Sequence, residues 1–98
     1  YATSVHENII NDPDFRIYPN PSEKFLNIEY TLNEPGDVRI TVFDSFGRAV
    51  RTLVDQKQQP GSYLYEWNSD LPAGGVYFIK LDGGKRQKIR KIILLGQN

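Results

Sequence analysis

The sequence predicts an all-β fold, a seven-stranded antiparallel β-sandwich, on three observations. Apolar and polar residues alternate over runs of about five to eight residues, which is the period of a strand with one buried face. Each run is bounded by Gly, Pro, Asn or Asp, residues that favour turns. The runs recur about every ten residues to the end of the chain, a spacing typical of a sandwich.

Length and composition narrow the classes of function. The 98 residues suffice for one small domain but leave little room for a deep substrate cavity beside a core. The net charge of zero does not indicate a nucleic-acid binder, and the absence of cysteine excludes disulfides and thiolate metal sites. Because no run of 18 apolar residues and no leading signal pattern occur, we expect a chain that does not span membranes. If the chain is exported, its signal is expected in an upstream segment.

The beginning of the chain is expected to be a linker. Residues 1–14 show no sustained period and end in turn-forming residues, so the folded domain is expected over residues 15–98. Residues 15–18 predict a short edge strand that Pro19 and Pro21 end, since proline lacks a backbone N–H. On the residues alone, this segment blunts an edge.

Two regular strands follow, over residues 26–32 and 37–43, and the sequence NEPG between them predicts a turn. Each strand alternates apolar residues with polar ones, so one face of each is expected in the core. The inward residues are Leu26, Ile28, Tyr30 and Leu32 in the first strand and Val38, Ile40 and Val42 in the second.

A hairpin turn is predicted at residues 44–48, where Gly47 can adopt the left-handed conformation that such a turn needs. Residues 48–54 then return from the turn. Their apolar residues have partial helical spacing, but the segment has neither an N-cap nor sufficient length for a helix. We therefore predict a strand, which can accommodate a bulge.

The fifth strand, residues 61–67, has two alternative inner faces. One face carries three aromatic residues, and the other carries Leu64 between two polar residues. Aromatic bulk favours the first face, Tyr63, Tyr65 and Trp67, with Trp67 as the largest contribution to the core.

The last two strands, residues 76–81 and 86–95, are predicted to form a hairpin. Asp82, Gly83 and Gly84 are expected to supply the positive φ angles of its turn.

Residues that could carry chemistry are few and scattered. His6 is the only histidine and lies in the expected linker, so a metal site built on it is improbable. We expect no catalytic residue, no cofactor and no metal, although a calcium site formed by Asp12 with Asp14, or by Asp70, stays open.

Two surface features have two readings each. Residues 85–91 contain five bases and no acid, which suits a patch for anionic lipid, lipopolysaccharide or an acidic protein, or else a solvated edge strand guarded against aggregation. The many tyrosines suit a sugar-stacking surface or the core and rim of a sandwich, and we favour the core.

Taken together, residues 15–95 resemble the type A C-terminal sorting domain of bacterial type IX secretion. The resemblance follows an ordered series of short pieces, FRIYPNP, LNIEYTL, VRITVFDSFGRAV, PGSYLYEWN, LPAGGVYFIKL and KIRKIILL. Its motif residues are Tyr18, Pro19, Asn20, Pro21, Asp44, Gly47, Arg48, Gly61, Tyr63, Gly75, Tyr77 and Lys91.

This resemblance implies an immunoglobulin-like sandwich that follows a cargo domain in a Gram-negative precursor. In the periplasm the domain would be an address that the outer-membrane translocon recognises. A sortase-like protease at the cell surface would then remove it, and the cargo would be released or joined to anionic lipopolysaccharide. With such a protease, we hypothesise that the segment of Pro19 and Pro21 also holds the upstream linker exposed to cleavage.

We expect recognition to involve the final strand, where an edge could accept a partner strand by β-augmentation. Its candidate contact residues are Lys88, Arg90, Lys91, Ile92, Ile93 and Leu94. Open edge strands also allow a weak dimer. The alternative functions are a structural immunoglobulin-like spacer or assembly module, similar to that of flagellar hook-capping proteins, and a carbohydrate-binding module.

Overall fold

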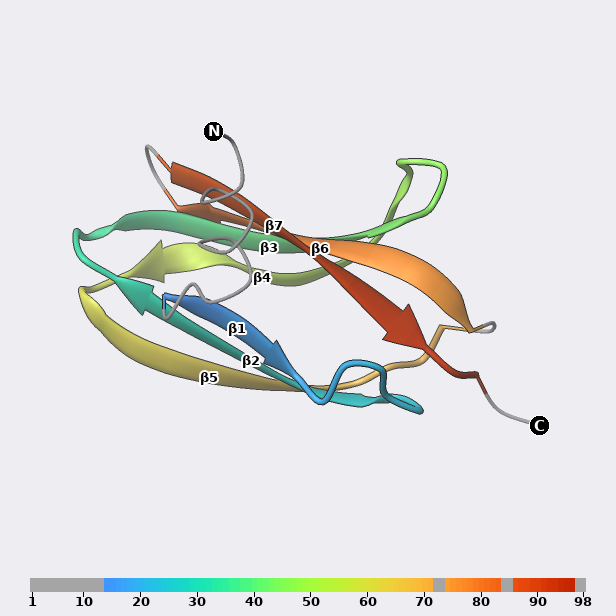
Figure 1. Cartoon of the computed structure of the whole chain (residues 1–98). Coiled ribbons are helices and arrows are strands. Elements are labelled where there is room, and N and C mark those ends of the chain that lie inside the picture. The colour runs from blue at the N-terminus through green and yellow to red at the C-terminus, as the bar shows by residue number, and fades with distance from the viewer. Residues whose placement is uncertain (1–13, 72–73, 84–85, 97–98) are drawn as a thin grey trace, which may run out of the picture.

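A computed structural model describes residues 14–71, 74–83 and 86–96, and its regular structure is entirely β-strand. The strands form a three-stranded sheet in the order β1-β2-β5 and a four-stranded sheet in the order β4-β3-β6-β7, which face each other (Figure 1). The predicted seven-stranded antiparallel β-sandwich is thus confirmed. The strands are β1 (Phe15–Tyr18), β2 (Phe25–Leu32), β3 (Gly36–Asp44), β4 (Ala49–Gln58), β5 (Gly61–Asn68), β6 (Gly75–Gly83) and β7 (Arg86–Leu94).

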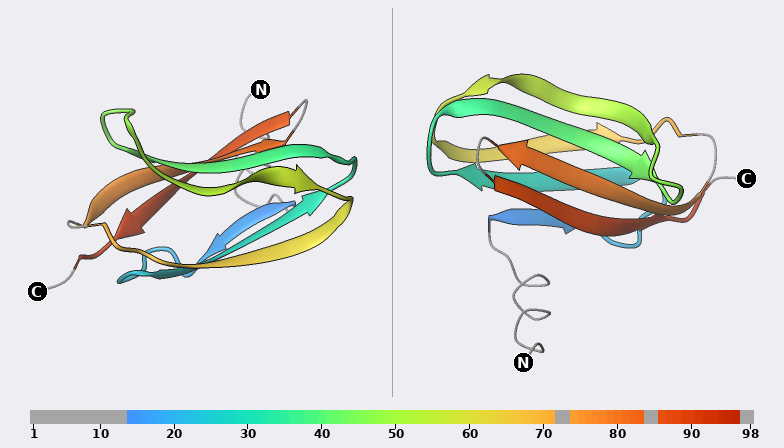
Figure 2. Two further views of the ribbon diagram at one scale, coloured as in Figure 1. Left: turned by 180° about the vertical axis from the view of Figure 1, so that it is seen from behind. Right: turned by 90° about the horizontal axis from the view of Figure 1, so that it is seen from above.

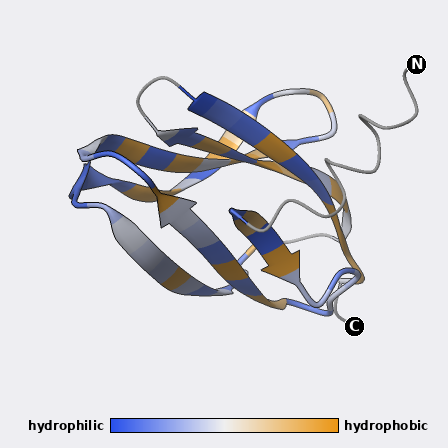
Figure 3. Cartoon of the chain, turned by 60° about the vertical axis from the view of Figure 1, so that its left-hand side comes forward, coloured by the Kyte–Doolittle hydropathy of each residue, from blue (hydrophilic) through white to orange (hydrophobic). Residues whose placement is uncertain are grey.

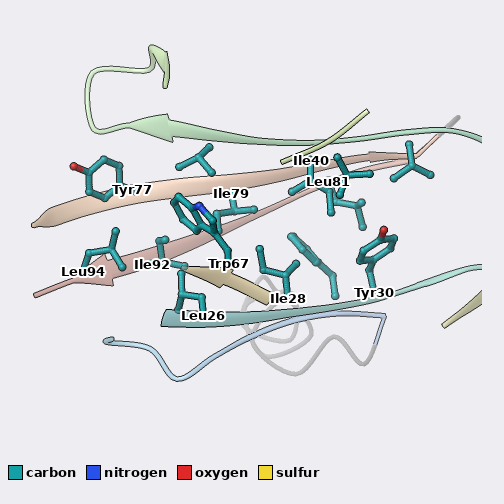
Figure 4. Close-up of a cluster of buried hydrophobic side chains, with 14 residues drawn as sticks. Leu26, Ile28, Tyr30, Ile40, Trp67, Tyr77, Ile79, Leu81, Ile92 and Leu94 are labelled. Carbon is teal, nitrogen blue, oxygen red and sulfur yellow. The ribbon is translucent and has the colours of Figure 1, made fainter. Parts of the chain in front are cut away.

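The core lies between the two sheets, and alternation along each strand fills it (Figures 3 and 4). In β2, Leu26 and Ile28 are fully buried while Glu29 between such positions points outward. Ile40 and Val42 of β3 and Ile79 of β6 meet them from the other sheet. Burying each aliphatic side chain of this size stabilises the fold by about 1.5 to 3 kcal/mol.

The aromatic face of β5 points into the sandwich, as predicted. Trp67 is buried, whereas Leu64 on the opposite face is 54% exposed. Tyr30 of β2 stacks on Tyr63, with ring centroids 5.3 Å apart and planes 9° from parallel. Tyr65 also packs against the core, so these tyrosines do not form an exposed platform for sugars.

The hairpin that joins β3 and β4 has the predicted turn, with Gly47 at a φ of 86°. The predicted fourth strand is confirmed and extends to Gln58, and its pairing with β3 shifts register twice, after Ile40 and after Val42. Such irregularities are β-bulges, which explains why the apolar spacing of this strand departs from a strict alternation.

The β6–β7 hairpin is present, but its turn differs from the prediction. Asp82 and Gly83 belong to β6, where they pair with Gln87 and Arg86, and neither has a positive φ. The pairing of β6 with β7 therefore includes two residues, Asp82 and Gly83, that the sequence predicts for the turn. Gly84, the third residue expected to have a positive φ, lies outside the described residues.

Residues 1–13 of the expected linker, with His6 and Asp12, also lie outside the described residues, so the linker assignment stays a prediction. In the part of the chain that the structure describes, no helix is long and apolar enough to cross a membrane.

Candidate recognition surface

The two sheets expose one edge strand each on the same side of the sandwich. β7 is an edge of the four-stranded sheet, as predicted, and β1 is an edge of the three-stranded sheet. The two strands lie side by side and run in the same direction (Figure 2). This side of the molecule therefore brings the predicted proline segment together with the predicted recognition strand.

The six predicted contact residues of β7 do not share one face. Ile92 and Leu94 point inward and belong to the core, so their side chains are not available to a partner in the folded domain. Ile93 is 37% exposed, and its neighbour Lys91 on the same face is exposed. The outer face of β7 also includes Ile89, which is 56% exposed and was not among the predicted contacts.

Two of the predicted surface cations, Lys88 and Arg90, point toward the other sheet. The Arg90 Nε donates to the backbone oxygen of Phe15 at 3.1 Å, and its guanidinium lies over the Phe15 ring, 5.7 Å from the centroid. The Lys88 Nζ lies 3.9 Å from a carboxylate oxygen of Asp14. These cations connect β7 to β1, and an inward-pointing charge is also one way in which proteins protect a sheet edge.

The segment between β1 and β2 joins two strands of one sheet and makes hydrogen bonds to β7 of the other sheet. Its peptide bonds Tyr18-Pro19 and Asn20-Pro21 are both cis. The Asn20 Nδ2 donates to the oxygen of Lys91 at 2.9 Å, and the backbone N–H of Ile93 donates to Asn20 Oδ1 at 3.0 Å. The side chain of Asn20 therefore pairs with β7 as a peptide group of a neighbouring strand would.

The buried Ser22 continues this pairing with its backbone. Its N–H donates to the oxygen of Ile93 at 3.0 Å, and its oxygen accepts from the N–H of Leu95 at 2.8 Å. The Ser22 hydroxyl donates to the oxygen of Phe25 at 2.6 Å, so the N–H, the C=O and the hydroxyl of this buried residue all have hydrogen-bond partners. We call Asn20 together with Ser22 the clasp.

The clasp limits where a partner strand could pair with β7. It occupies the outward backbone groups of Ile93, the oxygen of Lys91 and the N–H of Leu95. The expected augmentation site is accordingly narrower than the whole strand, because the clasp leaves only Arg86–Lys91, six of its nine residues, and already uses the oxygen of Lys91.

The other residues of the predicted motif contribute to the fold through hydrogen bonds, burial or backbone conformation. Tyr18 donates its hydroxyl to Glu29, which also pairs with Arg16 at 2.5 Å, and these bonds, that of Tyr18 first, lower the pKa of Glu29. Tyr63 donates to the oxygen of Gln59 at 2.5 Å. Tyr77 is buried, and Gly61 and Gly75 have φ angles of 149° and 139°.

Among the residues that the structure describes, no group of three His, Cys, Asp or Glu side chains could hold a metal ion. Asp70, one of the calcium candidates, bonds Arg51 Nε at 2.9 Å, and this bond lowers the pKa of Asp70.

Sequence reasoning missed the clasp and Gly74. A Cβ on Gly74 would lie 2.7 Å from backbone atoms of Gly96 and Leu94, so this glycine permits the chain before β6 to cross closely over the end of β7. The sequence did contain a signal for the clasp. The two prolines have no backbone N–H, so the side chain of the asparagine between them is the group that can hydrogen-bond in their place. No local pattern pointed to its partner, which lies 71 residues away.

The two antiparallel sheets, with the strand orders given above, are those of an immunoglobulin-like sandwich module. The family model of secretion system C-terminal sorting domains matches residues 16–95. The chain belongs to this family, so the domain is a C-terminal sorting signal of type IX secretion, which implies an upstream cargo and export toward the cell surface or the medium. This is not an enzyme family. No curated protein matched the chain.

Proposed function

We propose that the outer-membrane translocon recognises this domain in the periplasm as a folded object, through the side that carries β1 and β7. The observation that carries this proposal is the position of β7. Its Ile92 and Leu94 complete the core, and Arg90 and the clasp fasten it to β1. The address on this side therefore exists only when the last strand has folded onto the first.

A sortase-like protease at the cell surface then removes the domain, and the cargo is released or joined to anionic lipopolysaccharide. The position of β1 supports a cut upstream of the sandwich. Asp14 already pairs with Thr31 of β2 at 3.1 Å, so cleavage before Asp14 leaves the sheet intact. The domain itself contributes no reacting group to this step.

An export assay tests this function. The chain is fused behind a fluorescent reporter that has an N-terminal signal peptide, in a bacterium with a type IX secretion system. We expect the reporter outside the cell only with the intact chain, and we expect removal of residues 89–98 to abolish export. Export without these residues, or periplasmic retention of the intact fusion, would contradict the proposal.

Mass spectrometry of the exported reporter tests the removal step. We expect a reporter that has lost the sandwich, with a new end upstream of residue 14. A reporter that still carries the whole domain after export would show that no protease removes it.

A further inference from the structure

A groove runs between the two edge strands on the side described above. Its walls are β1 with Asn20 on one side and Ile89, Arg90 and Lys91 on the other. The contact between Arg90 and Phe15 crosses this groove and joins its two walls. The clasp closes the groove at one end, where it pairs with Ile93 and Leu95.

Both walls present backbone groups to the groove. Since backbone groups two residues apart point to the same edge of a strand, the pairing of Ile93 with the clasp places the N–H and C=O of Ile89 on the groove edge. On the other wall, Asp14 pairs with Thr31, so the groups of Ile17 point away from β2 and into the groove. Within the described part of the chain, the backbone of Ile89 has no partner on that edge.

The clasp also shows what fits beside β7. Asn20 and Ser22 follow the edge as a short parallel strand would, with an isolated parallel bridge between Ser22 and Leu94. On the N-terminal side of Asn20, the chain no longer follows the edge of β7 but forms β1. The remaining edge, Arg86–Lys91, is six residues long and spans roughly 20 Å, which is long enough for a short added strand.

The charge of the groove selects the partner. Three of its lining residues are the cations Arg16, Arg90 and Lys91, and none is acidic. Arg16 is paired with Glu29 outside the groove, whereas Lys91 is exposed at the rim. Ile17 and Ile89 add apolar surface. A segment that alternates carboxylates with apolar residues would complement both features.

From this geometry we infer that the groove binds one extended segment of an export-machinery protein, apolar and acidic in character, which adds as a strand to the Arg86–Lys91 edge of β7. This inference rests on the proposed function and names the kind of contact made. Backbone groups of the β7 edge make the binding contacts, and the clasp sets the end of the bound segment.

A proline scan of two matched positions tests the inference in the reporter fusion. Ile89 and Leu64 are 56% and 54% exposed, and each lies on an edge strand with its N–H directed away from the sheet. Neither Ile89→Pro nor Leu64→Pro removes a hydrogen bond of the sheet, but only the first blocks strand addition at the groove. We expect Ile89→Pro to reduce export at least tenfold and Leu64→Pro to reduce it less than twofold.

A second variant at the same position separates the backbone from the side chain. Ile89→Ala keeps the N–H, so we expect at least half of the wild-type export. Equal losses in Ile89→Ala and Ile89→Pro would assign the contact to a side-chain patch and overturn strand addition. Export of Ile89→Pro at the wild-type level would overturn it too, whereas failure of the unaltered fusion would instead contradict the proposed function.

Charge reversal keeps the inference testable if Ile89→Pro does not fold, as judged by circular dichroism. Lys91 and Lys57 are exposed lysines on the two edge strands of the same sheet, and only Lys91 lines the groove. We expect Lys91→Glu to reduce export at least fivefold and Lys57→Glu to leave it unchanged. Equal export of the two variants would overturn the inference.

Sedimentation of the purified chain tests a different occupant, a second copy of the domain. We expect a monomer for both the wild type and Ile89→Pro. A wild-type dimer that Ile89→Pro makes monomeric would assign the groove to self-association and overturn the proposed partner.

Discussion

At the scale of single residues, the side-chain amide of Asn20 takes the place of a strand backbone. The prolines on either side of it have no N–H to donate, and Asn20 supplies both a donor and an acceptor to β7. This arrangement joins two sheets through one short segment. The PNP sequence therefore does more than end β1. Its prolines cannot donate to the edge of β7, and its asparagine pairs with that edge instead.

Removing the Asn20 amide should weaken this pairing. Asn20→Ala loses two hydrogen bonds, so we expect a free energy of unfolding lower by about 1 to 2 kcal/mol in urea and faster hydrogen exchange at the Ile93 N–H. Asn20→Asp should lose more, because a carboxylate oxygen would face the oxygen of Lys91. Asn68→Ala, at an exposed position of β5, is the control and should leave the Ile93 exchange unchanged. Unchanged exchange in Asn20→Ala would refute the clasp.

Asp44 organises the β3–β4 turn in a similar way. Its carboxylate accepts from the backbone N–H groups of Phe46 at 2.9 Å and Arg48 at 3.0 Å, and it bonds Arg48 Nε at 2.9 Å. These bonds, that of the Arg48 backbone first, hold the pKa of Asp44 below its ordinary value. The turn is therefore stabilised by the ionised form of Asp44.

The lowered pKa of Asp44 makes this stabilisation depend on pH. A depressed pKa in the folded state contributes stability that is present above the ordinary value of about 3.9 and is lost as the pH falls toward the folded pKa. We expect Asp44→Asn to be less stable than the wild type at pH 7. The difference between their melting temperatures should shrink below about pH 4, measured by circular dichroism. A difference that stays constant down to pH 2.5 would show that the charge of Asp44 is not involved.

At the scale of elements, alternation predicted the strands because the core requires it. The buried faces of β2, β3 and β5 follow directly from their period of two, and Gly47 marked the β3–β4 turn. The same alternation also applied to β7, where it places Lys88 and Arg90 inward. Composition suggested a basic surface there, yet these cations have partners in Asp14 and Phe15, at the start of β1, that only the tertiary fold brings near.

The glycines did not by themselves predict where the turns and close contacts lie, because the role of each depends on neighbours distant in the sequence. Gly83 has no positive φ and pairs within the β6–β7 ladder. Gly74, in contrast, is required by the close approach of Gly96 and Leu94. The sequence offers no means of distinguishing these two roles, because the crossing is formed by a segment about twenty residues further along the chain.

The crossing at Gly74 predicts a site-specific cost of adding one methyl group. A Cβ at this position would meet backbone atoms at 2.7 Å, which cannot move as a flexible side chain could. We expect Gly74→Ala to lower the free energy of unfolding by about 1 to 3 kcal/mol. Gly36→Ala is the control, since it has no neighbour within 4 Å and no positive φ, and it should change stability by less than about 0.5 kcal/mol. Equal stabilities of the two variants would contradict the close crossing.

At the scale of the whole molecule, the sandwich joins its first and last strands. β1 and β7 belong to different sheets, and the clasp with Arg90 connects them on one side. The proposed recognition side is therefore assembled from both ends of the domain. A partner that binds this side would bind only the folded domain, as the proposed function requires.

A core substitution far from the groove tests whether folding itself is required for export. Ile28 of β2 is fully buried and does not line the groove, so a carboxylate there must be buried without a partner or the domain must unfold. We expect Ile28→Asp to lose the cooperative unfolding transition in circular dichroism and to abolish export of the reporter.

Leu64→Asp is the matched control for this test, because it adds the same charge to the same sheet at an exposed position. It should keep both the unfolding transition and export, since nothing in the core or the groove changes. An unfolded Ile28→Asp chain that still directs export would show that the machinery reads a linear peptide. In that case the residues of β7 would act through their order in the sequence, and the groove between β1 and β7 would have no part in recognition.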